Sequence, residues 1–182
     1  MVRDMRAVAA IALAGALAAC AGPAAPSIYR PSASPAAKVR SGEFALEISS
    51  PRDTWQADEP IQVQATLIYS GPGTTTIYGP EPDPLSFGVR EIGGTREMAA
   101  FLTYYGAPLQ IGPEPLVGEY RKSGGWSPGD DPNEAFYEAF FAEPEFRLPP
   151  GRWEVYVWAR FATEDGGPYT VDTTAGLWLT VE

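Results

Sequence analysis

The sequence has no histidine and only one cysteine, and these two absences exclude whole classes of function. Without histidine there is no Ser-His-Asp or Cys-His catalytic site and no His-ligated zinc or haem. A single cysteine forbids a disulfide within the chain and any thiolate metal cluster. Positive charge is scarce as well: 13 Lys and Arg stand against 23 Asp and Glu, a net charge of −10. This balance argues against binding to the phosphate backbone of nucleic acids.

What the 182 residues do contain is enough apolar material for one folded domain with appendages. Hydrophobic residues make up 45% of the chain, including five Trp, nine Tyr and eight Phe. Disorder throughout the chain is therefore excluded, because this composition supplies a packed core.

The first residues have the organisation of a signal peptide. Arg3 and Arg6 give a positively charged start, and residues 7–19 then run without a charge. Because spanning a bilayer takes about 20 apolar residues, this run is too short for a permanent span and suits the hydrophobic region of a signal peptide. It ends in Leu-Ala-Ala-Cys at 17–20, which resembles the lipobox of bacterial lipoprotein precursors. The resemblance implies cleavage before Cys20 and attachment of a diacylglycerol to its thiol; the alternative is an ordinary secretory signal with a chance cysteine.

The leader sets the expected domain organisation. Residues 1–19 are the signal peptide, and residues 20–40 are the lipidated cysteine followed by a disordered tether rich in Pro, Ala and Ser. Residues 41–182 form the folded domain. Two acyl chains anchor a protein stably where one does not. We therefore expect a cell-envelope protein that faces the periplasm or exterior and contacts the membrane through Cys20.

From residue 43 onward, hydrophobic residues alternate with polar ones, which is the period of half-buried β-strands. The expected strands are residues 43–49, 61–69, 74–78, 85–92, 96–105, 114–122, 152–161 and 176–182. For residues 96–105 the alternative is a helical turn, and the Thr and paired Tyr that end the segment favour the strand. Turn residues separate them, and no series of helices lies between them as a βαβ fold would require. The pattern predicts an all-β fold, an immunoglobulin-like antiparallel β-sandwich.

One short helix, about residues 132–142, is expected to interrupt the strands. Asp131 at the N-cap, Pro132 at the first helical position and Glu134 at the third have the form of a capping box. Aromatic residues four positions apart follow, and Pro144 ends the run. We expect this aromatic stripe to face the sandwich.

Several segments carry a resemblance to known families. They are IQVQATLIYSG (61–71), SFGVRE (86–91) and LPPGRWEVYVWARF (148–161). These strands and turns resemble bacterial immunoglobulin-like envelope domains and, more loosely, BsuPI-type proteinase-inhibitor domains. Both resemblances imply an all-β sandwich, and the second implies inhibition of a proteinase.

Aromatic and arginine side chains supply the candidate binding residues. Tyr156, Trp158 and Arg160 are expected to point outward from the strand at 152–161. Because Trp, Tyr and Arg are enriched at binding hot spots, they predict a platform for a sugar or a peptide. The alternative is that the helix, or a loop such as 101–109, covers this face. Trp126, in a Gly-rich loop, is a further candidate for binding or for packing on the helix or sandwich.

The densest group of oxygen ligands is a candidate calcium site, formed by Asp130, Asp131, Asn133 and Glu134. Their spacing matches no EF-hand loop. Helix capping and the helix dipole account for the same residues. We expect no cofactor and no other metal.

The sequence as a whole predicts a lipid-anchored envelope protein whose domain is a non-catalytic binding module and not an enzyme. Its partner is an unknown protein or glycan and not a nucleic acid. Two alternatives are a BsuPI-like proteinase inhibitor and a calcium-stabilised adhesion module.

Overall fold

The computed structural model describes residues 35–81, 84–101, 106–129, 131–164 and 167–182. The predicted signal peptide, Cys20 and most of the predicted tether lie outside these ranges. Within them, no helix has the length and apolar character needed to cross a membrane.

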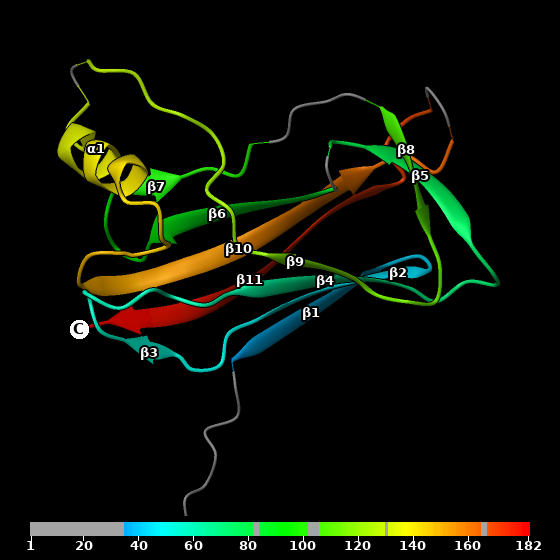
Figure 1. Cartoon of the computed structure of the whole chain (residues 1–182), viewed down its shortest axis with the longest axis horizontal. Coiled ribbons are helices and arrows are strands. Elements are labelled where there is room, and N and C mark those ends of the chain that lie inside the picture. Colours follow the sequence, from blue (N-terminus) through cyan, green and yellow to red (C-terminus); the bar gives the residue numbers. More distant parts are fainter. Residues whose placement is uncertain (1–34, 82–83, 102–105, 130, 165–166) are drawn as a thin grey trace, which may run out of the picture. The chain divides into compact units, whose positions relative to one another are not determined.

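Eleven strands and one helix make up the described part of the chain (Figure 1). The strands are β1 (Ala36–Ser41), β2 (Phe44–Ser49), β3 (Thr54–Trp55), β4 (Gln64–Tyr69), β5 (Thr75–Gly79), β6 (Leu85–Glu91), β7 (Glu97–Met98), β8 (Ala107–Ile111), β9 (Leu116–Glu119), β10 (Gly151–Phe161) and β11 (Val171–Val181). One sheet has the order β1-β2-β4-β9, a second β3-β11-β10-β6-β7, and β5 pairs with β8. The described pairs are antiparallel, except that β3 runs parallel to β11.

The core lies between the two larger sheets, and strict alternation in β10 builds much of it. Five inward side chains of this strand are completely buried: Trp153, Val155, Val157, Ala159 and Phe161. Across the core, the ring of Phe44 in β2 meets that of Phe161 edge-on, with 4.9 Å between centroids. Inward residues of the 61–69 segment are buried as well. The predicted fold class, an all-β antiparallel sandwich with one short inserted helix, is confirmed.

The helix α1 (Glu134–Ala142) begins later than the sequence predicts. Its N-cap is Asn133, not Asp131, and no side chain caps it. Asp131 instead accepts a hydrogen bond at Oδ1 from the Asn133 N–H at 2.7 Å, so residues 131–134 form a turn. Asn133 is bound to Thr95, whose carbonyl accepts from Asn133 Nδ2 at 3.1 Å. A tertiary contact thus takes the place of the predicted capping box.

The helix α1 lies at the end of the sandwich where β10 begins (Figure 1). Aromatic side chains dock it there. Phe140 is buried, and Phe136 stacks on Trp153 with 5.6 Å between ring centroids. The guanidinium of Arg96 lies 4.9 Å from the centroid of the Trp153 ring. The prediction that the aromatic stripe faces the sandwich is confirmed. Burial of these rings, more than helix propensity, stabilises so short a helix.

The ion pair between Arg96 and Glu91 makes the free energy of unfolding depend on pH. Arg96 Nε donates to Glu91 Oε2 at 2.8 Å, and this bond lowers the pKa of the Glu91 carboxyl below its usual 4.5. As pH falls below 4.5 the unfolded chain takes up this proton first, so the contribution to stability is lost on acidification. We expect Glu91→Gln, which cannot titrate there, to flatten the acid limb of stability against pH in urea denaturation between about pH 5 and 3. Equal slopes for both proteins would contradict this.

The predicted tether is partly wrong. Residues 36–41 form β1, which pairs along its whole length with β2, from Ala36 opposite Ser49 to Ser41 opposite Phe44. Ala37 and Val39 pack against the core from this strand. This segment has the composition of a disordered spacer, but pairing with β2 orders it. Composition alone does not reveal that a partner strand is available.

Other strand boundaries differ from the expected ones. Of the predicted strand at 96–105, the described residues form β7, and residues 102–105 lie outside the described ranges. The strand β11 begins at Val171, five residues before the predicted start. The short strands β3 and β8 are not predicted at all. β3 pairs with β11 and β8 pairs with β5, so in these two strands pairing with a distant segment overrides weak local preference.

Candidate functional site

The predicted binding residues lie in two different places. Tyr156, Trp158 and Arg160 share the outward side of β10, and all three are half-buried. Trp126 belongs to the segment after β9 and lines a separate cavity. Cys20 lies outside the described residues.

Arg160 is held between two aromatic rings. Its guanidinium carbon lies 4.0 Å from the centroid of the Tyr169 ring and 5.3 Å from that of Trp158. Its Nε is buried, lies 3.4 Å from Asp172 Oδ2 and makes no hydrogen bond. Asp172 accepts at Oδ1 from the Trp158 indole N–H at 2.7 Å. These contacts arrange two rings, one cation and one carboxylate in a single preorganised cluster.

Trp178 is the surface residue that the sequence analysis overlooked. Its side chain is 65% exposed on the outward side of β11, where it lies opposite Glu154 of β10. Alternation was the available signal, because Leu177 and Leu179 flank Trp178 in the sequence and are buried on the inward side. We use the name aromatic face for the outward surface formed by Trp158, Arg160, Tyr169, Asp172 and Trp178.

On the outward side of β11, the position between the levels of Trp158 and Trp178 is a glycine, Gly176, which has no side chain. Gly176 lies opposite Tyr156, and an added Cβ there would come within 2.8 Å of Glu154 Oε1. Glycine inside a strand often marks a place where another group approaches closely. From Trp178 to Asp172 the surface extends over roughly 20 Å of strand.

Tyr156 is engaged by the protein itself. Its hydroxyl accepts a hydrogen bond from the Ala100 N–H at 3.2 Å, and burial raises its pKa. An added Cβ at Gly88 of β6 would lie 2.3 Å from the Tyr156 ring, so only glycine leaves room for that ring. Of the predicted platform residues, Tyr156 thus supports the segment that covers this part of the sheet.

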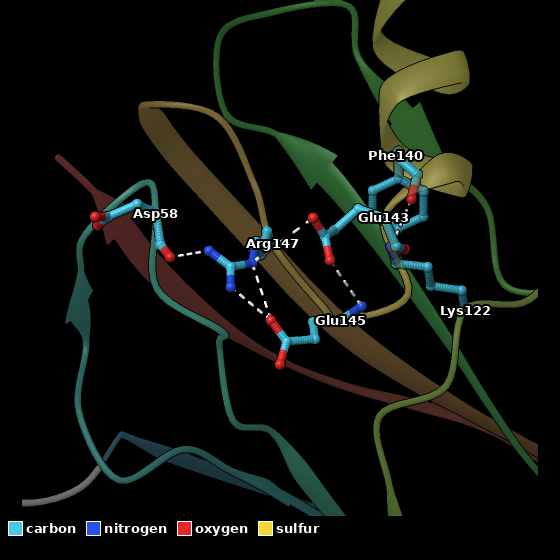
Figure 2. A network of polar contacts seen from close by, with 6 residues as sticks. All are labelled: Asp58, Lys122, Phe140, Glu143, Glu145 and Arg147. Carbon is cyan, nitrogen blue, oxygen red and sulfur yellow. Dashed lines mark hydrogen bonds and ion pairs between the residues drawn. The ribbon is translucent and has the colours of Figure 1, made fainter.

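Lys122 binds the C-terminal end of α1 (Figure 2). Its Nζ donates to the carbonyl of Phe140 at 2.5 Å and to that of Glu143. Burial lowers the pKa of Lys122, and the nearby Glu143 carboxylate opposes this. A cation is favourable at the negative end of a helix dipole and satisfies carbonyls that lack partners within the helix. Lys122 therefore stabilises the C-terminal end of α1.

Arg147 connects the segment after α1 to the loop after β3 (Figure 2). Its Nη1 donates to the carbonyl of Asp58, and its Nη2 donates to Glu145 Oε2 at 2.5 Å. Glu143 lies 3.9 Å away as a further ion-pair partner. Arg147 and the two glutamates therefore stabilise the local structure as ion pairs.

The candidate calcium residues are largely engaged in the start of α1. Asp131 accepts from the Asn133 backbone, and the Asn133 side chain bonds to Thr95. Glu134 lies in the first turn of the helix. Asp130 lies outside the described residues. Within the described part of the chain, no group of three or more His, Cys, Asp or Glu is placed to hold a metal ion.

No family model, curated protein or solved structure matches this chain. The resemblances to lipoprotein precursors and to BsuPI-type domains stay predictions from the sequence.

Proposed function

We propose that this protein is a lipid-anchored cell-envelope protein whose β-sandwich is a non-catalytic binding module, and that the aromatic face binds a glycan. The observation that carries the proposal is the 65% exposure of Trp178 on the same outward sheet surface as Trp158, which lies opposite Thr174 of β11. Trp is among the residues most enriched at binding hot spots.

The surroundings of Trp178 favour a sugar. A sugar ring has an apolar C–H face and a rim of hydroxyls. The exposed indole suits that face. Thr180, two residues along β11, and Glu154, which is ion-paired with Arg90, offer polar groups close by, and Thr174 offers a hydroxyl farther along, opposite Trp158. Arg160 and Asp172 add charged groups at the other end of the aromatic face.

A protein ligand fits this surface less well. A standard protein interface needs an apolar core within about 800 Å² per partner. Among the described residues, four large hydrophobic side chains are exposed, and only Trp178 and Tyr169 belong to the aromatic face. Two rings separated by polar side chains make a poor apolar core.

The anchor part of the proposal rests on the leader. A basic start, an uncharged run too short to span a bilayer and a cysteine directly after it have the order found in lipoprotein precursors. Because the chain is acidic, anionic lipid heads would repel its domain, so a covalent anchor is the means of holding it at a membrane.

Trp178→Ala tests the binding surface. In a glycan array probed with the full-length chain, we expect the wild type to retain one class of oligosaccharide and the variant to lose at least about tenfold in affinity. Trp126→Ala is the matched control, since Trp126 is outside the aromatic face, and its affinity should be unchanged.

Two results would overturn this proposal. One is glycan binding that survives Trp178→Ala, and the other is the absence of any glycan ligand together with a protein ligand lost in that variant. Stoichiometric inhibition of a serine proteinase that is unaffected by Trp178→Ala would favour the BsuPI-like alternative instead.

A further inference from the structure

A cavity of about 520 Å³ lies between the end of β7, the segment 124–127 and α1. Its volume is within the range of small-molecule sites, roughly 300–1,000 Å³. It is separate from the aromatic face, so an inference about it does not depend on the proposed glycan function. The side chains that give the cavity its chemistry are Glu97, Met98, Phe101, Trp126, Asp131 and Tyr137.

The lining of this cavity is aromatic and acidic. Phe101, Trp126 and Tyr137 contribute three rings, and Met98 contributes a polarisable thioether. The face of an aromatic ring carries negative electrostatic potential, which attracts cations. The remaining charged lining residues, Glu97 and Asp131, are both carboxylates, and no Lys or Arg is among the described lining residues. The charged side chains that line the cavity therefore favour a positively charged ligand.

Hydrogen bonds to the sheet hold one wall of the cavity in place. The Ala100 N–H donates to the Tyr156 hydroxyl at 3.2 Å. The Phe101 carbonyl accepts from Ser86 Oγ at 2.7 Å, and the Phe101 N–H donates to Ser123 Oγ at 3.3 Å. A wall that is already ordered lowers the entropic cost of binding. This also explains why Phe101, with its side chain 61% exposed, stays at the cavity.

The opposite wall depends on a glycine. Gly124 has φ +85°, a conformation that side-chain-bearing residues rarely adopt. The position of an added Cβ would lie 3.7 Å from the Ala99 carbonyl and 4.0 Å from Met98 Cε, so the backbone passes close to the first wall. The turn at Gly124 brings Trp126 back to the cavity.

We propose that this cavity binds a small organic cation of the quaternary ammonium class, with a choline-type head. Methyl groups on the nitrogen suit contact with Phe101, Trp126 and Tyr137, since such a nitrogen has no proton to donate. Glu97 and Asp131 balance its charge without needing direct hydrogen bonds. Asp131 is kept near the cavity because its Oδ1 already accepts from the Asn133 backbone.

Calorimetric titration of the full-length chain at constant ionic strength tests this. We expect choline chloride to bind with a Kd below about 10 mM, and 3,3-dimethylbutanol, its neutral isostere, to bind at least about tenfold more weakly. Glycerophosphocholine, the source found in lipid heads, should also bind more weakly than choline because Glu97 and Asp131 repel its phosphate.

Matched variants separate the cavity from the rest of the molecule. Trp126→Ala and the charge-neutralising Glu97→Gln should each weaken choline binding several-fold, while Trp178→Ala leaves it unchanged. Circular dichroism of each variant checks that it is folded, and Trp126→Phe, which keeps a ring, should retain most of the affinity. Absence of choline binding, equal binding of the neutral isostere, or loss of binding in Trp178→Ala would overturn the proposal.

Discussion

Replacing Trp153 with alanine is expected to lower the free energy of unfolding by about 3–5 kcal/mol. The side chain is completely buried on the inward side of β10. Its ring stacks on Phe136 of α1, and its indole N–H donates to the Pro149 carbonyl at 3.0 Å. Truncation opens a cavity and removes the surface on which α1 docks. Because small domains have only about 5–15 kcal/mol of stability, this one change removes much of it.

Urea denaturation measures this effect, and Trp178→Ala is its control. Both changes remove an indole from the same sheet, but Trp178 is 65% exposed, and its loss should alter stability by no more than about 0.5 kcal/mol. A loss below about 1 kcal/mol for Trp153→Ala, or equal losses for the two variants, would contradict the assignment of the two sides of this sheet.

Cys20→Ser is expected to abolish lipid attachment completely. The thiol of Cys20 is the one nucleophile in the chain that a diacylglycerol transfer can use, because no other cysteine is present. In a bacterial host fed labelled palmitate, we expect the wild type to carry the label and to begin at residue 20 by mass spectrometry. The variant should carry no label and stay uncut, since the lipobox resemblance ties the cleavage to this cysteine.

The neighbouring substitution Ala21→Ser is the control for Cys20→Ser. It changes the residue after the predicted cleavage position and should leave the label in place. If the wild-type protein is cleaved near residue 20 but carries no palmitate label, the leader is an ordinary secretory signal. The part of the proposed function that concerns a lipid anchor would then be wrong. Cleavage of Cys20→Ser at an unchanged position would contradict it in the same way.

The sequence predicted well wherever one strand has one buried side. In β10 the two-residue period separated Trp153 and Phe161 from Trp158, and the structure buries the first two completely. The same period places Leu177 and Leu179 on the inward side, where they are buried. It also places Trp178, between them, on the outward side, where it is exposed; the sequence analysis did not draw this conclusion. Periodicity succeeds because successive side chains of a strand point to opposite faces, a purely local property.

What the sequence by itself determined is therefore local: the alternation that makes strands, the turns between them, the aromatic stripe of α1 and the form of the leader. Only the tertiary structure decided which segments meet. It ordered Ala36–Ser41 by pairing it with β2, moved the start of α1 to Asn133 by binding that residue to Thr95, and placed Ala100 over Tyr156. The physical reason is that pairing, covering and cavity formation depend on contacts between residues far apart in the chain, whose free energy no short stretch of sequence contains.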